Sequence, residues 1–112
     1  MSLTEKHCVP CEGNVPPLTK PEIETLQKEL TLKWIVEHDK VIQHLFTFRN
    51  FVEAIAFVDK IALVAEAEGH HPDITINYNK VTIALQTHAI KGLSDNDFIL
   101  AANIEKIGSY IN

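Results

Sequence analysis

The sequence has no run of like charges and no uninterrupted apolar stretch of the ~20 residues that a membrane span needs. Ten Lys and Arg stand against fifteen Asp and Glu, which gives a formal net charge of -5. This balance provides no basic patch of the kind that binds nucleic acid. The longest apolar stretch, residues 54–67, is interrupted by Asp59, Lys60 and Glu66. We therefore expect direct contact with neither nucleic acid nor a membrane.

A hydrophobic leader is also missing, because residues 1–7 pass directly to polar side chains. A secretion signal would need an apolar segment there, so we expect a cytoplasmic location. The 112 residues suit one domain with one core.

Cysteine is scarce, and the two that are present form a Cys-x-x-Cys pair at Cys8 and Cys11. A structural zinc ion needs four ligands, and no second pair exists. A redox pair is expected between a strand and a helix, whereas residues 8–18 contain three of the five prolines. We expect residues 1–18 to form an extended arm with reduced cysteines, and residues 19–112 to form the domain.

Capping patterns predict where the helices begin. Thr19 followed by Glu22 is a capping-box pattern that predicts a short helix, and Asn50 is the expected first cap of a longer, largely buried helix. Gly69 is well placed to end that second helix. Ser94, with an acidic residue three positions later, predicts the start of a last helix.

Apolar and polar residues alternate between these helices. Residues 32–36 and 41–48 predict one hairpin, and residues 74–78 and 81–85 predict a second. The expected order is α-β-β-α-β-β-α, an α+β fold with a four-stranded antiparallel sheet and three helices on one face.

The other face of such a sheet is left partly apolar. Ile35, Val41 and Leu45 are expected on that open side or at its edge. Because exposed apolar sheet surface is normally covered, we expect a homo-oligomer, either a dimer or a tetramer.

Histidine is concentrated in one region, since His70, His71 and His88 are three of the six in the chain. Imidazoles brought together near neutral pH suggest either acid-base chemistry or metal binding. Neighbouring residues on an extended segment point to opposite sides, so His70 and His71 are poorly placed to bind one metal ion. We favour proton transfer without a metal.

The histidines belong to a longer pattern that resembles the signature of the pterin-4a-carbinolamine dehydratases, also called 4a-hydroxytetrahydrobiopterin dehydratases. The matching residues, at the spacing of that signature, are Glu66, His70, His71, Pro72, Tyr78, His88 and Asp97. The resemblance extends over residues 18–107 and includes Trp34 and the Phe46-x-Phe48 pair. The N-terminal Cys-x-x-Cys-Glu-Gly segment is similar to the bacterial branch of this family.

The resemblance implies a dehydratase that removes water from 4a-hydroxytetrahydrobiopterin, or from a related pterin, to give a quinonoid dihydropterin. It implies no cofactor, a dimer or tetramer, and a functional partnership with an aromatic amino acid hydroxylase, which makes the substrate. The three motif histidines are expected to line the pterin pocket.

The chemistry needs one group that protonates the leaving hydroxyl and another that takes a proton from the adjacent nitrogen. We expect His70 and His88 to transfer these protons and His71 to orient the substrate. Because the substrate can be either of two epimers, the acid is expected to be His70 for one and His88 for the other. Glu66, one helical turn earlier, is expected to fix the tautomer of His70 or raise its pKa.

The resemblance also implies substrate contacts outside the histidine rings. The backbone of two segments is expected to bind the pterin edge: Gly69, His70 and His71, and Gln86, Thr87, His88 and Ala89. Trp34 is expected to supply an aromatic wall. Asp97 fits a capping role better than a catalytic one, and Glu68 is expected to be a solvated charge.

A second class of function stays open on the same fold. Animal members of the family act as dimerisation partners of a homeodomain transcription factor, so a non-catalytic regulatory binding protein is the alternative. The complete set of His70, His71 and His88 favours the enzyme, because a scaffold does not need it.

Overall fold

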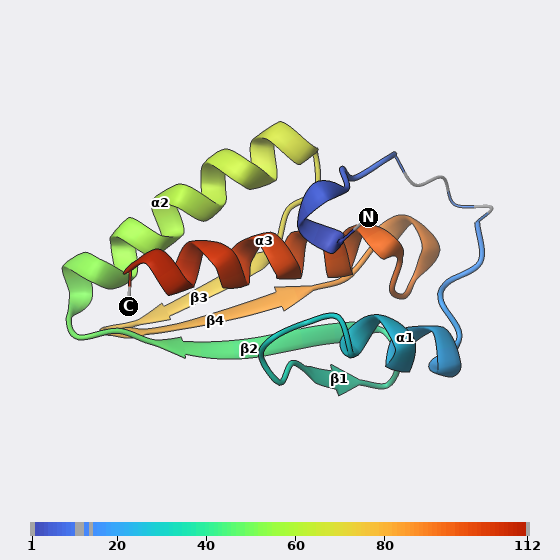
Figure 1. The fold of residues 1–112 in the computed structure, drawn as a ribbon, viewed down its shortest axis with the longest axis horizontal. Coiled ribbons are helices and arrows are strands. Elements are labelled where there is room, and N and C mark those ends of the chain that lie inside the picture. Colours follow the sequence, from blue (N-terminus) through green and yellow to red (C-terminus); the bar gives the residue numbers. More distant parts are fainter. Residues whose placement is uncertain (1, 11–12, 14, 112) are drawn as a thin grey trace.

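The computed structural model describes residues 2–10, 13 and 15–111. Its elements, in chain order, are η1 (Leu3–Glu5), α1 (Lys20–Gln27), β1 (Ile35–Glu37), β2 (Val41–Thr47), α2 (Phe51–Glu68), β3 (Asp73–Asn77), β4 (Lys80–Leu85), η2 (His88–Ile90) and α3 (Asp95–Ile111). The predicted order α-β-β-α-β-β-α is confirmed, with the short 3-10 helices η1 and η2 in addition (Figure 1).

The four strands form one antiparallel sheet in the order β1-β2-β4-β3. Each hairpin keeps its own two strands together, and α2 carries the chain from β2 across to the second hairpin. The long helices α2 and α3 lie side by side over one face of the sheet (Figure 1). The predicted α+β fold is confirmed.

Both ends of α2 are defined by the residues that the sequence predicted. The Asn50 side chain accepts a hydrogen bond from the Glu53 amide at 2.9 Å, which satisfies one of the first free N–H groups of the helix. Gly69 ends the helix with a φ of 66°, a left-handed conformation that favours glycine. The His70 amide then donates to the Ala65 carbonyl at 3.2 Å, so the chain turns sharply away from the helix axis.

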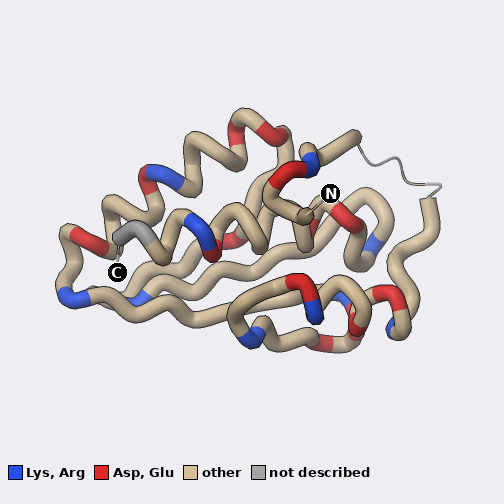
Figure 2. The backbone as a smooth tube through the Cα atoms, viewed as in Figure 1, with Lys and Arg blue, Asp and Glu red and all other residues tan. Residues whose placement is uncertain are grey.

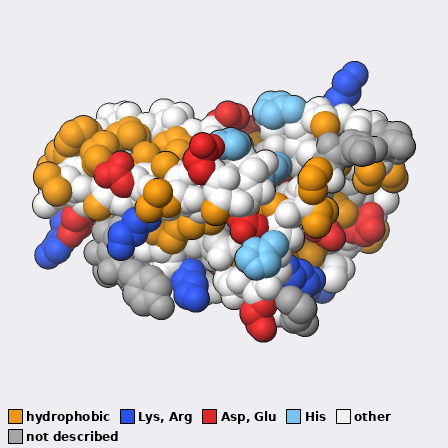
Figure 3. All heavy atoms as spheres, turned by 90° about the horizontal axis from the view of Figure 1, so that it is seen from above, with side chains coloured by type: hydrophobic (Ala, Val, Ile, Leu, Met, Phe, Trp, Pro, Cys, Tyr) orange, Lys and Arg blue, Asp and Glu red, His pale blue; other side chains and the backbone are white. Residues whose placement is uncertain are grey.

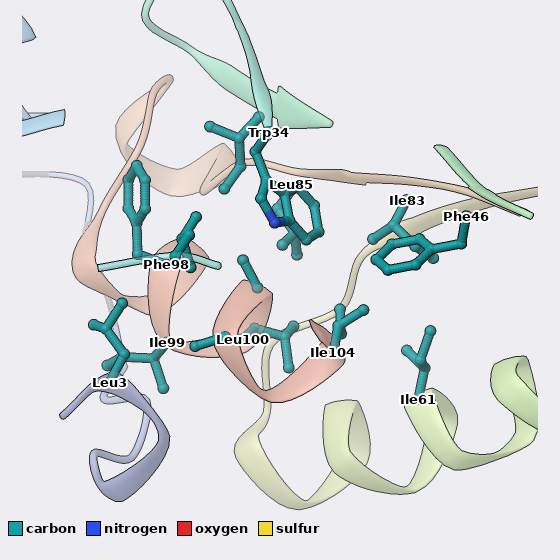
Figure 4. Close-up of a cluster of buried hydrophobic side chains, with 14 of the residues drawn as sticks. Leu3, Trp34, Phe46, Ile61, Ile83, Leu85, Phe98, Ile99, Leu100 and Ile104 are labelled. Carbon is teal, nitrogen blue, oxygen red and sulfur yellow. The ribbon is translucent and has the colours of Figure 1, made fainter. Parts of the chain in front are cut away.

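The core lies between the sheet and the two long helices (Figure 4). Alternate residues of β2 and β4 point into it, because successive strand residues face opposite sides. The Phe57 ring on α2 contacts both Phe46 and Phe48, with ring centroids 4.8 and 4.9 Å apart. From α3 come Phe98, Ile99, Leu100, Ala101 and Ile104, all buried.

The opposite face of the sheet is open, as expected. Ile35 and Leu45 on that face are 60% and 51% exposed. Apolar side chains are exposed on α2 as well, where Val52 and Leu63 are 75% and 74% exposed. Hydrophobic side chains also gather on the face of the molecule seen in Figure 3.

Two further global features concern membranes and charge. Within the described ranges, no helix combines the length and the apolar character that crossing a membrane requires. Lys and Arg are interspersed with Asp and Glu over the described backbone (Figure 2).

The Phe57 contacts predict a large loss of stability on truncation. Phe57→Ala should lower the free energy of unfolding by about 3–5 kcal/mol, because it leaves a cavity among buried rings. Urea unfolding measures this change. Lys60→Ala, an exposed charged position on the same helix, is the control and should stay within about 0.5 kcal/mol of the wild type; equal effects of the two substitutions would contradict the core described here.

Candidate active site

A cavity of about 280 Å³ lies where α2 ends, β4 ends and the N-terminal segment passes. Its lining residues come from these three segments and from the first turn of α3: Val9, Pro10, Gly69, His70, His71, Gln86, Thr87, His88, Ala89 and Asn96. The structure thus brings together the three motif histidines with each of the backbone segments named from the sequence.

His70 is held by a buried carboxylate. Its Nε2 lies 2.6 Å from Oδ1 of Asp97, and the Asp97 side chain is completely buried. The carboxylate oxygen accepts a hydrogen bond from Nε2–H, which leaves Nδ1 as the ring nitrogen available to a substrate. A buried carboxylate is stable only when it is well hydrogen-bonded, so this contact orients the ring firmly.

The second oxygen of Asp97 is satisfied from two other directions. Oδ2 accepts from the Thr87 hydroxyl at 2.8 Å and from the Ser94 amide at 3.0 Å. The single Thr87 proton goes to Asp97, so the Ser94 hydroxyl donates to Thr87 at 2.7 Å. The expected capping contact of Asp97 with Ser94 is present. The same side chain also holds His70, which the capping interpretation did not include.

Glu66 is paired differently from the expectation. Its carboxylate binds Nε2 of His71, on the exposed side of the chain, and not His70. The reason is the left-handed turn at Gly69, which takes the chain out of the helical path that would place His70 above Glu66. The expectation that Glu66 fixes the tautomer of His70 is therefore wrong, because the His70 ring is hydrogen-bonded to Asp97 instead.

His88 begins the short helix η2 in a loop that closes on itself. The Thr87 amide donates to the Gly92 carbonyl at 2.8 Å, and the Gly92 amide donates back at 3.4 Å. Gly92 has no room for a side chain, since a Cβ there would lie 2.6 Å from Cβ of Pro17. The His88 ring is exposed on this loop, and the described residues give it no hydrogen bond.

The N-terminal segment completes the cavity. Glu68 accepts from the Cys8 amide at 2.7 Å and contacts the His7 ring at 2.9 Å. The Cys8 amide, followed by His7, lowers the pKa of the Glu68 carboxyl below its usual value. Glu68 was expected to be a solvated charge; this was wrong, because its partners are 60 and 61 residues away in the sequence. Cys11 lies outside the described residues.

Trp34 does not take the position expected of it. It is 4% exposed and lies in the core, with its ring against Phe46 and His44. Its indole N–H donates to Glu105 at 2.9 Å. Because both its ring and its N–H already have partners within the fold, Trp34 does not line the histidine cavity, and the aromatic wall assigned to it is wrong.

Two other features bear on the choice of site. In the part of the chain that the structure describes, no three His, Cys, Asp or Glu side chains are grouped closely enough to hold a metal ion.

A larger hollow of about 540 Å³ lies between η1, the α1–β1 loop and α3. It contains no histidine, so we assign the chemistry to the smaller cavity.

Comparison with known proteins shows the family of the chain. The family model described as pterin 4 alpha carbinolamine dehydratase matches residues 16–107. The chain belongs to this family. A provisionally named pterin-4-alpha-carbinolamine dehydratase from Halorhodospira halophila is 44% identical over 97% of this chain and 100% of the relative. A provisionally named pterin-4-alpha-carbinolamine dehydratase from Rickettsia bellii is 47% identical over 93% of this chain and 92% of the relative's length.

Solved structures give the same fold. A transcriptional coactivator/pterin dehydratase from Brucella melitensis has a TM-score of 0.77 at 31% identity, covering 82% of this chain and 98% of that chain. A pterin dehydratase-like protein described as a RuBisCO assembly factor in the alpha-carboxysome has a TM-score of 0.62 at 22% identity. It covers 70% of this chain and 92% of its own, and it shows the fold alone.

The hydrogen bonds around Asp97 predict a stability effect of Thr87. Thr87→Val removes one donor from a fully buried carboxylate, and it should lower the free energy of unfolding by about 1–3 kcal/mol. Thr82→Val, on the open face of the preceding strand, is the control and should stay within about 0.5 kcal/mol of the wild type. Urea unfolding compares the two variants, and an unchanged Thr87→Val protein would show that Asp97 does not depend on this donor.

Proposed function

We propose that this protein is a 4a-hydroxytetrahydrobiopterin dehydratase, a hydro-lyase that acts on this pterin or a related 4a-carbinolamine. The observation that carries the proposal is the contact between the buried Asp97 carboxylate and His70, in a cavity that His88 shares. An oriented imidazole beside a second imidazole is the arrangement that general acid-base catalysis requires.

The reaction balances without a redox partner. An acid protonates the hydroxyl on the 4a carbon, the C–O bond breaks, and water leaves. The lone pair of the adjacent nitrogen forms the new C=N bond, and a base then removes the proton from that nitrogen. The quinonoid dihydropterin and water contain all the atoms and electrons of the substrate, so no cofactor is needed.

Each side chain has a role in this scheme. His70, oriented through Nε2 by Asp97, exchanges the proton at Nδ1. His88 is the second proton-transferring group, and the two exchange acid and base roles between the substrate epimers. His71, held by Glu66, orients the pterin. The backbone of residues 69–71 and 86–89 binds its polar edge.

The substrate has to come from an enzyme that oxygenates a tetrahydropterin at its 4a carbon. We propose an aromatic amino acid hydroxylase as this functional partner, so that the dehydratase supports recycling of the tetrahydropterin. The coactivator and assembly-factor descriptions belong to the two solved structures. A protein with only a binding role would not need the His70–Asp97 contact, so we prefer the enzyme.

Removal of either proton-transferring ring should slow the reaction. His70→Ala and His88→Ala should each lower the rate of dehydration by ~10²-fold or more. The assay follows loss of the 4a-hydroxypterin with purified protein and a chelator present. His38→Asn is the control, since His38 lies in the β1–β2 turn at a φ of 52° that asparagine tolerates. Wild-type rates in both alanine variants would end the assignment.

The exposed apolar surfaces lead us to propose a homodimer or homotetramer. Light scattering at micromolar concentration should give a mass at least twice the 12.6 kDa of one chain. Leu45→Lys, on the open sheet face, and Leu63→Lys, on α2, should reveal which surface is buried, because a charge placed in an apolar interface opposes association. A wild-type protein with the mass of one chain would refute the oligomer.

A further inference from the structure

We propose that the N-terminal segment His7–Pro10 is a wall of the substrate cavity, where Val9 and Pro10 contact the bound pterin, and that Glu68 and Asn96 are positioning residues for it. The inference rests on the proposed function and adds a specificity element to it. The segment His7–Pro10 precedes residue 16, where the match to the family begins.

The first attachment of this segment is to the end of α2. The Cys8 amide donates to Oε1 of Glu68 at 2.7 Å, while Oε2 contacts the His7 ring at 2.9 Å. The Glu68 side chain is only 14% exposed although it carries a charge. A largely covered carboxylate is stable here because a backbone N–H and an imidazole both bind it.

The second attachment is to the first turn of α3. The Asn96 amide brackets the backbone of Val9: its oxygen accepts the Val9 N–H at 3.0 Å and its nitrogen donates to the Val9 carbonyl at 2.6 Å. Asn96 is 3% exposed. A buried amide that satisfies both backbone groups of one residue fixes the position and the orientation of that residue.

The segment follows the cavity loop beyond these two attachments. A Cβ at Gly13 would lie 3.2 Å from the Ala89 carbonyl oxygen, so the backbone passes close to the loop that carries His88. The Leu18 amide then donates to the Leu93 carbonyl at 2.9 Å. The described parts of residues 7–18 therefore contact the end of α2, the first turn of α3 and the η2 loop in turn. Figure 1 shows the N-terminal segment running past this end of the molecule toward α1.

The chemistry of the cavity explains what the segment contributes. Imidazoles, a threonine, a glutamine and an asparagine supply the polar part of the cavity lining, whereas Val9 and Pro10, together with Ala89, supply apolar side chains. A pterin has polar edges but flat, apolar ring faces, so it gains from an apolar surface beside its hydrogen-bonding groups. Val9 is 65% exposed, and it therefore has surface that a ligand can cover.

The attachments also lie beside the catalytic contact. Glu68 is two residues before His70, and Asn96 directly precedes Asp97. The segments that hold the wall are therefore the same two segments that form the His70–Asp97 pair. Because the same two segments hold both, the position of the wall is fixed relative to the His70 ring, the proposed proton-transferring group.

Substitution at Val9 tests the wall directly. Val9→Ser should raise KM about fivefold, because it removes apolar surface that the substrate covers, and should change kcat less than about twofold. The matched control is Val15→Ser, at a valine that is 47% exposed, lies beyond this segment and does not line the cavity. It should behave as the wild type. Equal KM values in the two variants would overturn the proposal.

The positioning role needs a readout that loss of stability does not reproduce. Glu68→Ala removes the acceptor for the Cys8 amide and should raise KM. Glu68→Gln keeps an acceptor oxygen, so its KM should stay close to that of the wild type. If Glu68 acts through the wall, its alanine substitution should raise KM much less when Val9→Ser is already present. Independent effects of the two substitutions would overturn the positioning role.

Binding of 7,8-dihydrobiopterin, measured by calorimetry, separates this proposal from the proposed function. Val9→Ser should weaken its binding by about the same factor as it raises KM. A wild-type protein that neither binds this pterin nor dehydrates the carbinolamine would refute the function and the wall together. If the wild type is active and the Val9→Ser variant binds the pterin as tightly as the wild type does, the wall alone is refuted.

Discussion

The fully buried carboxylate of Asp97 is the constraint on which the site depends. A charge without access to water is stable only when hydrogen bonds surround it, and here they come from the imidazole of His70, the hydroxyl of Thr87 and the amide of Ser94. These three partners lie after α2, after β4 and at the start of α3. One side chain therefore joins the ends of three elements and orients the ring that we propose transfers a proton.

The left-handed turn at Gly69 gives two adjacent histidines different surroundings. It ends α2 so that His70 faces the interior and Asp97, whereas His71 faces solvent and returns to Glu66. A ring held by a buried carboxylate and a ring held by an exposed one have different freedom to move. This difference supports a division between proton transfer and substrate orientation.

The segment before the family match connects the two sides of the cavity. Glu68 and Asn96 hold it by backbone hydrogen bonds, which do not depend on the identity of the side chains that they position. The attachment therefore leaves the side chains of Val9 and Pro10 to line the cavity. Leu3, at the other end of this segment, is buried in the main core.

The sequence by itself determined the elements of the fold, because caps such as Asn50 and Gly69 and the alternation within each hairpin are local properties of neighbouring residues. It also identified the three histidines of the cavity, through a motif of fixed spacing. Only the tertiary structure decided the long-range hydrogen-bond partners. These are Asp97 for His70 across 27 residues, Asn96 for Val9 across 87, and Glu105 for Trp34 across 71. Such contacts follow from how helices and strands come together in space, and no local pattern records them.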